Sequence, residues 1–193
     1  MKKITIILIF ASMIILSMLI PAGAISTRAG DFLKACMTLD TPFPPKNWSN
    51  DDIRSAALEV LDAVEAGKIS LWPRTFCVIA LGYVKNPDDL PRILVYEDEM
   101  PCTVLQSLKG FAHPDAINYL IRHLTSDTDS TRELSVIGLA AMNFDTMDEP
   151  MVWYNKVSSA LKTALKKETE DWLKKDIQTA ISNLKKPETS GTS

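Results

Sequence analysis

The sequence predicts an all-α protein built from antiparallel helical hairpins. Between residues 50 and 186, apolar side chains recur at spacings of three and four, with no convincing two-residue alternation of the kind a strand shows. Short turns separate the predicted helices, which favours antiparallel neighbours. The 193 residues are 46% hydrophobic and 23% charged. This balance and length are typical of one globular domain of ordinary size, and exclude a disordered chain or a multispanning membrane protein.

The first 24 residues have the three parts of a secretory signal peptide. Lys2 and Lys3 precede an uncharged run over residues 4–20, and Pro-Ala-Gly-Ala follows at 21–24. The small residues place the expected cleavage between Ala24 and Ile25, and no cysteine follows the cut to accept a lipid. We therefore expect an exported protein, periplasmic or secreted, with no stable membrane span after cleavage. An uncleaved leader that anchors the chain is the alternative, because the uncharged run reaches the lower end of a bilayer span.

Residues 25–49 are predicted to form an N-terminal helix and a proline-rich connection. Phe32, Leu33 and Cys36 suit a short helix, whereas the prolines at 42, 44 and 45 require an extended chain. Cleavage at Ala24 would remove two lysines and no acidic residue, leaving 19 basic and 24 acidic side chains and a net charge of about −5. An acidic exported protein of this kind is not expected to bind nucleic acid.

The first well-marked helix is expected to begin after Ser49, a good N-cap, and to stop at Gly67. A second helix should run from Trp72 to Val84 and end before Asn86-Pro87, because proline can open a helix but not continue one. A short helix with an apolar face follows. Its face consists of Leu90, Ile93 and Leu94.

Five further segments complete the predicted element order. The range 104–112 reads as a helix closed by His113-Pro114, and the next helix should start at that proline. Ser130 and Glu133 have capping-box spacing and are expected to open a helix with Leu134, Ile137, Gly138 and Ala141 on its inner side. Two longer helices follow, with apolar faces over 157–165 and 172–184. Residues 187–193 are expected to be a disordered tail.

The helices fall into four successive pairs, and the second helices of these pairs have similar sequences. The segment that begins at Arg74 can be aligned with the segments that begin at Pro101 and Arg132, and more weakly with the segment that begins at Lys174. The offsets of 27, 31 and about 42 residues indicate an irregular repeat.

On these segments, and above all on His113–Leu124 with its continuation to Arg132, the chain resembles the short bacterial type of the HEAT-repeat family. The resemblance implies a short α-solenoid over residues 50–186. It also implies that Asp127 or Asp129 pairs with Arg132 to stabilise neighbouring repeats. A generic helical bundle is the alternative to this architecture.

The sequence offers little to carry chemistry. No common catalytic motif is present, and the spacings of Cys36, Cys77 and Cys102 match no zinc pattern. A disulfide between two of the cysteines stays open, and Cys77 and Cys102 are expected to be buried and unpaired. His113 reads as a cap, and His123 as a residue near a helix end. Asp127 and Asp129 read as a helix-capping turn rather than a calcium loop. We therefore expect no catalytic residue, cofactor or metal ion.

Two charged segments are candidates for recognition. Glu97, Asp98 and Glu99 form an acidic turn that is either a solvated loop or a surface for a basic partner. The lysines of the penultimate helix could rest on anionic lipid, although a solvated repeat face explains them more simply. Those lysines are Lys156, Lys162, Lys166 and Lys167.

The leading functional hypothesis is an exported, non-catalytic scaffold or adaptor that binds a protein partner through its helical-repeat surface. The identity of the partner and the oligomeric state stay open. The alternative is an enzyme or enzyme accessory factor, because some HEAT-like proteins resemble bilin lyases. A deep pocket that gathers His123, carboxylates and a cysteine would favour the alternative, and a broad groove with exposed aromatic residues would favour the adaptor.

Overall fold

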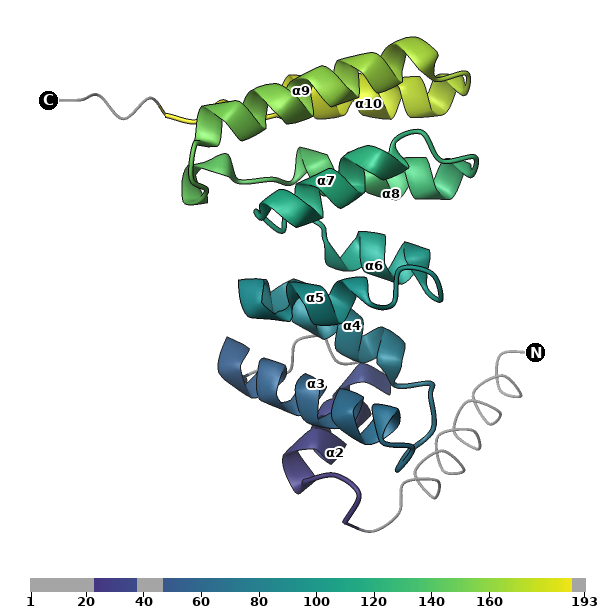
Figure 1. Cartoon of the computed structure of the whole chain (residues 1–193), viewed down its shortest axis with the longest axis vertical. Coiled ribbons are helices and arrows are strands. Elements are labelled where there is room, and N and C mark those ends of the chain that lie inside the picture. The colour runs from purple at the N-terminus through teal and green to yellow at the C-terminus, as the bar shows by residue number, and fades with distance from the viewer. Residues whose placement is uncertain (1–22, 38–46, 189–193) are drawn as a thin grey trace, which may run out of the picture. The chain divides into compact units, whose positions relative to one another are not determined.

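The computed structural model describes residues 23–37 and 47–188, and this part of the chain is all α-helical, as the sequence predicts (Figure 1). Nine α-helices and two 3₁₀-helices are present in these ranges, and no strand. The chain divides into two compact units, Met1–Val84 and Lys85–Ser193. This boundary falls inside the range 50–186 that the sequence suggested as a single repeat domain. Residues 1–22, which hold most of the predicted signal peptide, lie outside the described ranges, as do residues 38–46 and 189–193.

The first unit contains α2 (Thr27–Met37), α3 (Asn50–Glu65) and α4 (Arg74–Val84). Helix α3 packs against both of the others. Ser49 caps α3 as predicted, in a capping box in which the Asp52 amide donates to the Ser49 hydroxyl and the Ser49 amide donates to the Asp52 carboxylate. These hydrogen bonds, with the nearby Arg28 charge, hold the pKa of Asp52 below its ordinary value. Gly67 ends the helix at a φ of +67°, also as predicted.

Two polar contacts tie the start of α2 to α3. The Arg28 guanidinium lies 2.6 Å from the Asp52 carboxylate, and the Ser26 hydroxyl donates to Glu59 at 2.7 Å. The core between the helices is apolar and fully buried. It is made by Phe32, Ile53, Ala57, Val60, Leu61, Cys77, Val78 and Leu81.

The second unit begins with a 3₁₀-helix, η1 (Pro87–Asp89), and the short helices α5 (Leu90–Leu94) and α6 (Pro101–Ser107). It continues with α7 (Pro114–His123), α8 (Asp129–Ala140), η2 (Phe144–Thr146), α9 (Pro150–Lys167) and α10 (Asp171–Asn183). Helix α8 is central, because it packs against α6, α7 and α10, and α10 in turn packs against α9. The hairpin α7–α8 therefore lies against the hairpin α9–α10 (Figure 1).

Two glycines allow close packing in the second unit. Gly138 on α8 faces the buried Leu120 of α7, and a Cβ atom at Gly138 would lie 2.9 Å from a Leu120 methyl group. Gly110 has a φ of +64°, and a Cβ there would lie 2.7 Å from the Ala141 carbonyl oxygen. This left-handed turn is why α6 ends at Ser107, although the apolar pattern predicted a helix through residue 112.

The prediction for the start of α8 is wrong. The helix begins at Asp129 after Thr128, so Ser130 lies inside it and forms no capping box with Glu133. The inner face also differs, because Ile137 is 38% exposed and Ala141 is exposed, whereas Thr131 and Ser135 are buried. The Ser135 hydroxyl donates to the Thr131 carbonyl at 2.8 Å, which satisfies its hydrogen bonding inside the helix. Thr131 and Ser135 therefore lie on the buried face of α8, to which the apolar pattern had assigned Ile137 and Ala141.

The chain after α10 stays in contact with the second unit as far as it is described. Pro187 is buried, and the Glu188 amide donates to the Asp145 carboxylate at 3.3 Å. Residues 187 and 188 of the expected tail are thus packed, and residues 189–193 lie outside the described ranges.

Candidate partner-binding surface

The acidic turn follows α5 and is held by backbone hydrogen bonds. The Glu97 amide donates to the Leu94 carbonyl at 3.0 Å, and Tyr96 is buried beside it as an anchor. Glu97 is half-buried, while Asp98 and Glu99 are exposed. The turn therefore presents its three carboxylates differently, with Glu97 turned toward the protein.

One face of α7 meets this turn. Arg122 donates to the Glu97 carboxylate at 2.9 Å, and its guanidinium lies 5.0 Å from the centre of the Tyr119 ring. The His123 ring stacks on Tyr119 with a centroid distance of 4.3 Å. Because the Tyr119 carbonyl can only accept, the His123 Nδ1 donates to it at 3.0 Å, which leaves Nε2 available.

Tyr119 is the buried centre of this cluster. It is 4% exposed, and its hydroxyl oxygen is buried without a hydrogen-bond partner. Burial, and then the negative charges of Glu97 and Asp98, raise the pKa of Tyr119 to about 12, with the Arg122 charge acting in the opposite direction. The hydroxyl therefore stays protonated at physiological pH.

Two small cavities adjoin the cluster. One of about 380 Å³ is lined by Glu97, Tyr119 and Arg122 together with Leu94, Asp115 and Asn118. The other, of about 220 Å³, is lined by Glu97, Asp98, Tyr119, Arg122 and His123. We call these last five residues the Tyr119 patch.

The smaller cavity bears on the enzyme alternative. It gathers His123 with two carboxylates, which meets part of the expectation for a chemical site, but no cysteine lines it. Its volume is also below the range of about 300–1,000 Å³ that is usual for organic ligands. The larger cavity, of about 380 Å³, falls within that range but is not lined by His123.

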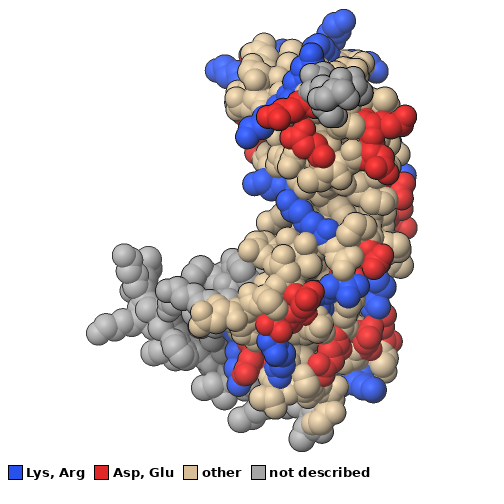
Figure 2. All heavy atoms as spheres, turned by 90° about the vertical axis from the view of Figure 1, so that its left-hand side faces the viewer, with Lys and Arg blue, Asp and Glu red and all other residues tan. Residues whose placement is uncertain are grey.

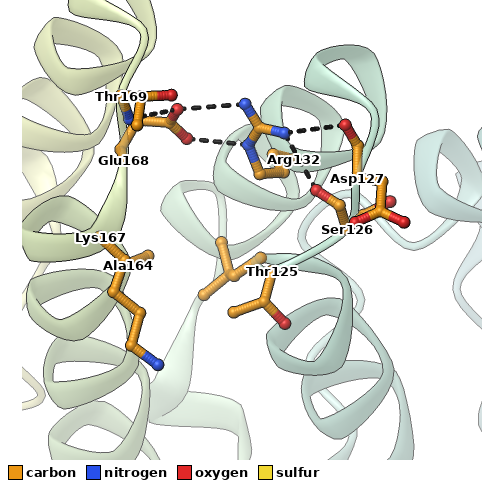
Figure 3. A pocket seen from close by; sticks show the side chains of 9 residues that line it. Thr125, Ser126, Asp127, Arg132, Ala164, Lys167, Glu168 and Thr169 are labelled. Carbon is orange, nitrogen blue, oxygen red and sulfur yellow. Dashed lines mark hydrogen bonds and ion pairs between the residues drawn. The ribbon is translucent and has the colours of Figure 1, made fainter.

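A third cavity, of about 400 Å³, lies where the α7–α8 turn faces the end of α9 (Figure 3). Arg132 of α8 reaches across it to Glu168, with Nε–Oε2 and Nη2–Oε1 distances of 2.8 and 3.1 Å. The same guanidinium donates to the Asp129 carboxylate at 2.8 Å and to the Ser126 and Asp127 carbonyls. Its donors are therefore fully engaged within the fold.

The structure brings the three predicted repeat-stabilising residues together, with Asp127 and Arg132 lining this cavity and Asp129 beside Arg132. Asp129 pairs with Arg132, whereas Asp127 contributes its backbone carbonyl and not its carboxylate. The main partner, Glu168, was not foreseen, because it lies 36 residues away in a turn with no periodic signal. Asp129 is held by Arg132, and no side chain caps the start of α8, so the turn acts in packing and the predicted capping role is wrong.

Glu168 is a buried carboxylate, with a side chain only 4% exposed. Burial would by itself raise its pKa. The hydrogen bonds from Arg132 and from the amides of Glu170 and Thr169, with the Arg132 charge, outweigh burial and lower the pKa of Glu168 below its ordinary value. The ionised pair is thus a fixed part of the fold.

A shallower and more apolar cavity of about 430 Å³ lies between α8 and α10. Ile137, Ala140 and Ala180 supply apolar lining, and Lys109 and Asp176 lie at it as well. On the face shown in Figure 2, acidic and basic side chains are interspersed rather than gathered into one large field. Recognition by charge on that face therefore depends on local groups.

His113 and the three cysteines are the remaining candidates from the sequence. His113 caps α7 as predicted, because its Nδ1 accepts from the Asp115 amide at 3.2 Å. Cys36, Cys77 and Cys102 are unpaired. Cys77 is buried as expected, but Cys102 is exposed because it lies in the first turn of α6, on its outer side. Burial raises the pKa of Cys36 to about 12 and that of Cys77 further.

Within the described ranges, no group of three or more His, Cys, Asp or Glu residues is arranged to hold a metal ion. In the same part of the chain, none of the helices has both the length and the apolar character needed to cross a bilayer. Of the four lysines of α9, Lys156 donates to Asn118 at 2.7 Å and lies over the Trp153 ring.

Tyr119 is the residue of this surface that sequence reasoning missed. Its signal was its spacing: Arg122 and His123 follow it by three and four residues, which places all three on one face of a helix. Comparison of the chain with protein-family models, with curated proteins and with solved structures found no match.

Proposed function

We propose that this protein is an exported, non-catalytic scaffold that binds a protein partner through the surface of stacked helical hairpins of the HEAT-like kind. The observation that carries the proposal is the Tyr119 patch, a charged and aromatic cluster with an unsatisfied hydroxyl beside two small cavities. A fold that uses most of its residues as packed helices offers extended surface for recognition.

The packing of the second unit supports the repeat part of the proposal. Helices α5–α6, α7–α8 and α9–α10 are successive pairs, and α8 lies between α6 and α10. A hairpin cannot bury its apolar face alone, and a neighbouring pair supplies the missing partner. In the first unit, α3–α4 is a further pair of the same kind.

The test is capture of a partner from living cells. The full-length chain, tagged at its C-terminus, is expressed in its native host, crosslinked in place and analysed by mass spectrometry of the extracellular or periplasmic fraction. We expect the chain in that fraction to begin at Ile25 and to carry a reproducible protein crosslink. A chain that stays in the cytoplasm would contradict export, and an exported chain without any protein crosslink would contradict the adaptor role.

A further inference from the structure

The Tyr119 hydroxyl is a buried polar group without a hydrogen-bond partner. Buried side-chain polar atoms in folded proteins nearly always have a hydrogen-bond partner, because an unmade bond costs the full desolvation of the group. Tyr119 is 4% exposed and lines both cavities, and its buried hydroxyl has no such partner. A group that must donate a proton and has no acceptor in the fold points to an acceptor supplied from outside.

The charged residues around the hydroxyl indicate whether that ligand is a cation or an anion. Asp98 is exposed and, within the described part of the chain, forms no hydrogen bond or ion pair. Asp115 lines the larger cavity, and Glu97 lines both. Arg122 offsets one of these three negative charges, and Lys156, which donates to Asn118 at the larger cavity, offsets a second. The patch is therefore net negative with a neutral His123, which favours a cation and repels a phosphate.

Arg122 already makes the kind of contact that we expect of a cationic ligand. Its guanidinium lies over the Tyr119 ring and donates to Glu97, but its side chain is 64% exposed. An ion pair of this exposure contributes little to stability and can open or share its carboxylate. A second cation can therefore be taken up between Glu97 and Asp98 without breaking the core.

A peptide satisfies both requirements at once. Its backbone carbonyl is the acceptor that the Tyr119 hydroxyl lacks, and a lysine or arginine side chain is the cation that Asp98 lacks. A free amine offers the cation without the carbonyl. The two cavities, of about 220 and 380 Å³, share Glu97, Tyr119 and Arg122 as lining, and so suit neighbouring residues of one chain.

We propose that the Tyr119 patch binds a basic peptide segment of the protein partner, with a lysine or arginine side chain between Glu97 and Asp98 and a peptide carbonyl accepting from the Tyr119 hydroxyl. This inference rests on the proposed adaptor function and names the chemistry of its partner.

The experiment titrates the ¹⁵N-labelled full-length chain, in the form its host produces, with acetyl-Lys-Lys-Lys-amide at about 150 mM salt. We expect saturable amide shifts at residues 97–99 and 119–123. Acetyl-Glu-Glu-Glu-amide should produce none. Butylammonium should bind at least about threefold more weakly than acetyl-Lys-amide, which carries the same single charge and adds the carbonyl.

Two variants and two matched controls test the assignment. Asp98→Asn and Tyr119→Phe should each weaken trilysine binding by about three- to tenfold. Asp148→Asn removes an exposed carboxylate elsewhere in the same unit, and Tyr154→Phe removes a half-buried hydroxyl that lies outside the patch. Both controls should bind as the unmodified chain does. Circular dichroism confirms that all four variants are folded.

The inference is overturned if trilysine gives no saturable shifts at the patch, if triglutamate binds equally well, or if Tyr119→Phe behaves like Tyr154→Phe. Its failure can be told apart from failure of the adaptor function. A partner crosslinked in cells and retained by both patch variants would leave the adaptor role standing and remove the patch from it. Trilysine binding at the patch without any protein crosslink in cells would support the peptide-binding patch and contradict the adaptor role.

Discussion

The Arg132 guanidinium donates to both oxygens of the Glu168 carboxylate, with nitrogen–oxygen distances of 2.8 and 3.1 Å. These hydrogen bonds join α8 to the turn that follows α9. Both side chains are nearly buried, at 13% and 4% exposure. Paired planar groups of this kind combine charge with a fixed geometry. The contact therefore sets how the α7–α8 hairpin meets the α9–α10 hairpin.

Arg132→Met should lower the free energy of unfolding by about 3 kcal/mol, because Glu168 would be left buried and without its cation. Arg122→Met is the matched control, since that arginine is exposed, and it should cost less than about 1 kcal/mol. Urea unfolding followed by circular dichroism measures both. Equal effects of the two substitutions would show that the buried pair has no special role.

Acid should weaken the fold through Glu168. Its pKa in the folded chain lies below the ordinary value of 4.5, so its contribution is fully present above pH 4.5 and is lost as the pH falls through the lower, folded value. Glu168→Gln should therefore be less stable than the unmodified chain at pH 7, and the gap should narrow as the pH is lowered below 4.5. Urea unfolding at several pH values measures the gap, and Glu133→Gln on α8 serves as control. A gap that is independent of pH would contradict this assignment.

Tyr119→Phe should leave the free energy of unfolding unchanged or raise it by about 1 kcal/mol. The substitution removes a buried hydroxyl that has no partner, and so removes its desolvation cost. Thermal and urea unfolding measure the change. Together with weaker trilysine binding, greater stability would mark a residue kept for recognition. A loss of more than about 1 kcal/mol would instead mean that the hydroxyl stabilises the fold.

Gly110→Ala should destabilise the chain by more than about 2 kcal/mol, because a side chain is strained at its positive φ and the new methyl group would meet the Ala141 carbonyl. Gly67→Ala provides the comparison. Gly67 has nearly the same φ but open space around it, so the substitution should cost only about 1 kcal/mol. Chemical unfolding of both variants separates backbone strain from the clash, and equal costs would exclude the clash.

Local signals in the sequence were enough for most of the helices. Ser49, Gly67 and His113 act as predicted, because caps and stops depend on a few neighbouring residues. The predicted boundaries failed at α6 and at the start of α8. At α6 the chain turns where Gly110 meets the backbone of Ala141, a contact between residues 31 positions apart. Propensity cannot anticipate such a contact.

The candidate surface divides in the same way. The acidic turn and Arg132 were visible as charged residues at loop and helix starts, whereas Tyr119 and Glu168 were not singled out. Tyr119 belongs to this surface only because Glu97, 22 positions earlier, lines the same two cavities. Glu168 is significant only as the partner of Arg132, 36 positions before it.

By itself, the sequence determined that the described chain is helical and where most helices begin, since apolar spacing and capping act within a few residues. Only the tertiary structure decided which polar groups are paired, buried or left without a partner. Burial and pairing depend on residues brought together from distant positions, and a linear pattern of charges does not contain those distances. The Tyr119 hydroxyl and the Glu168 carboxylate show the two outcomes: one is buried and unsatisfied, the other buried and fully bound.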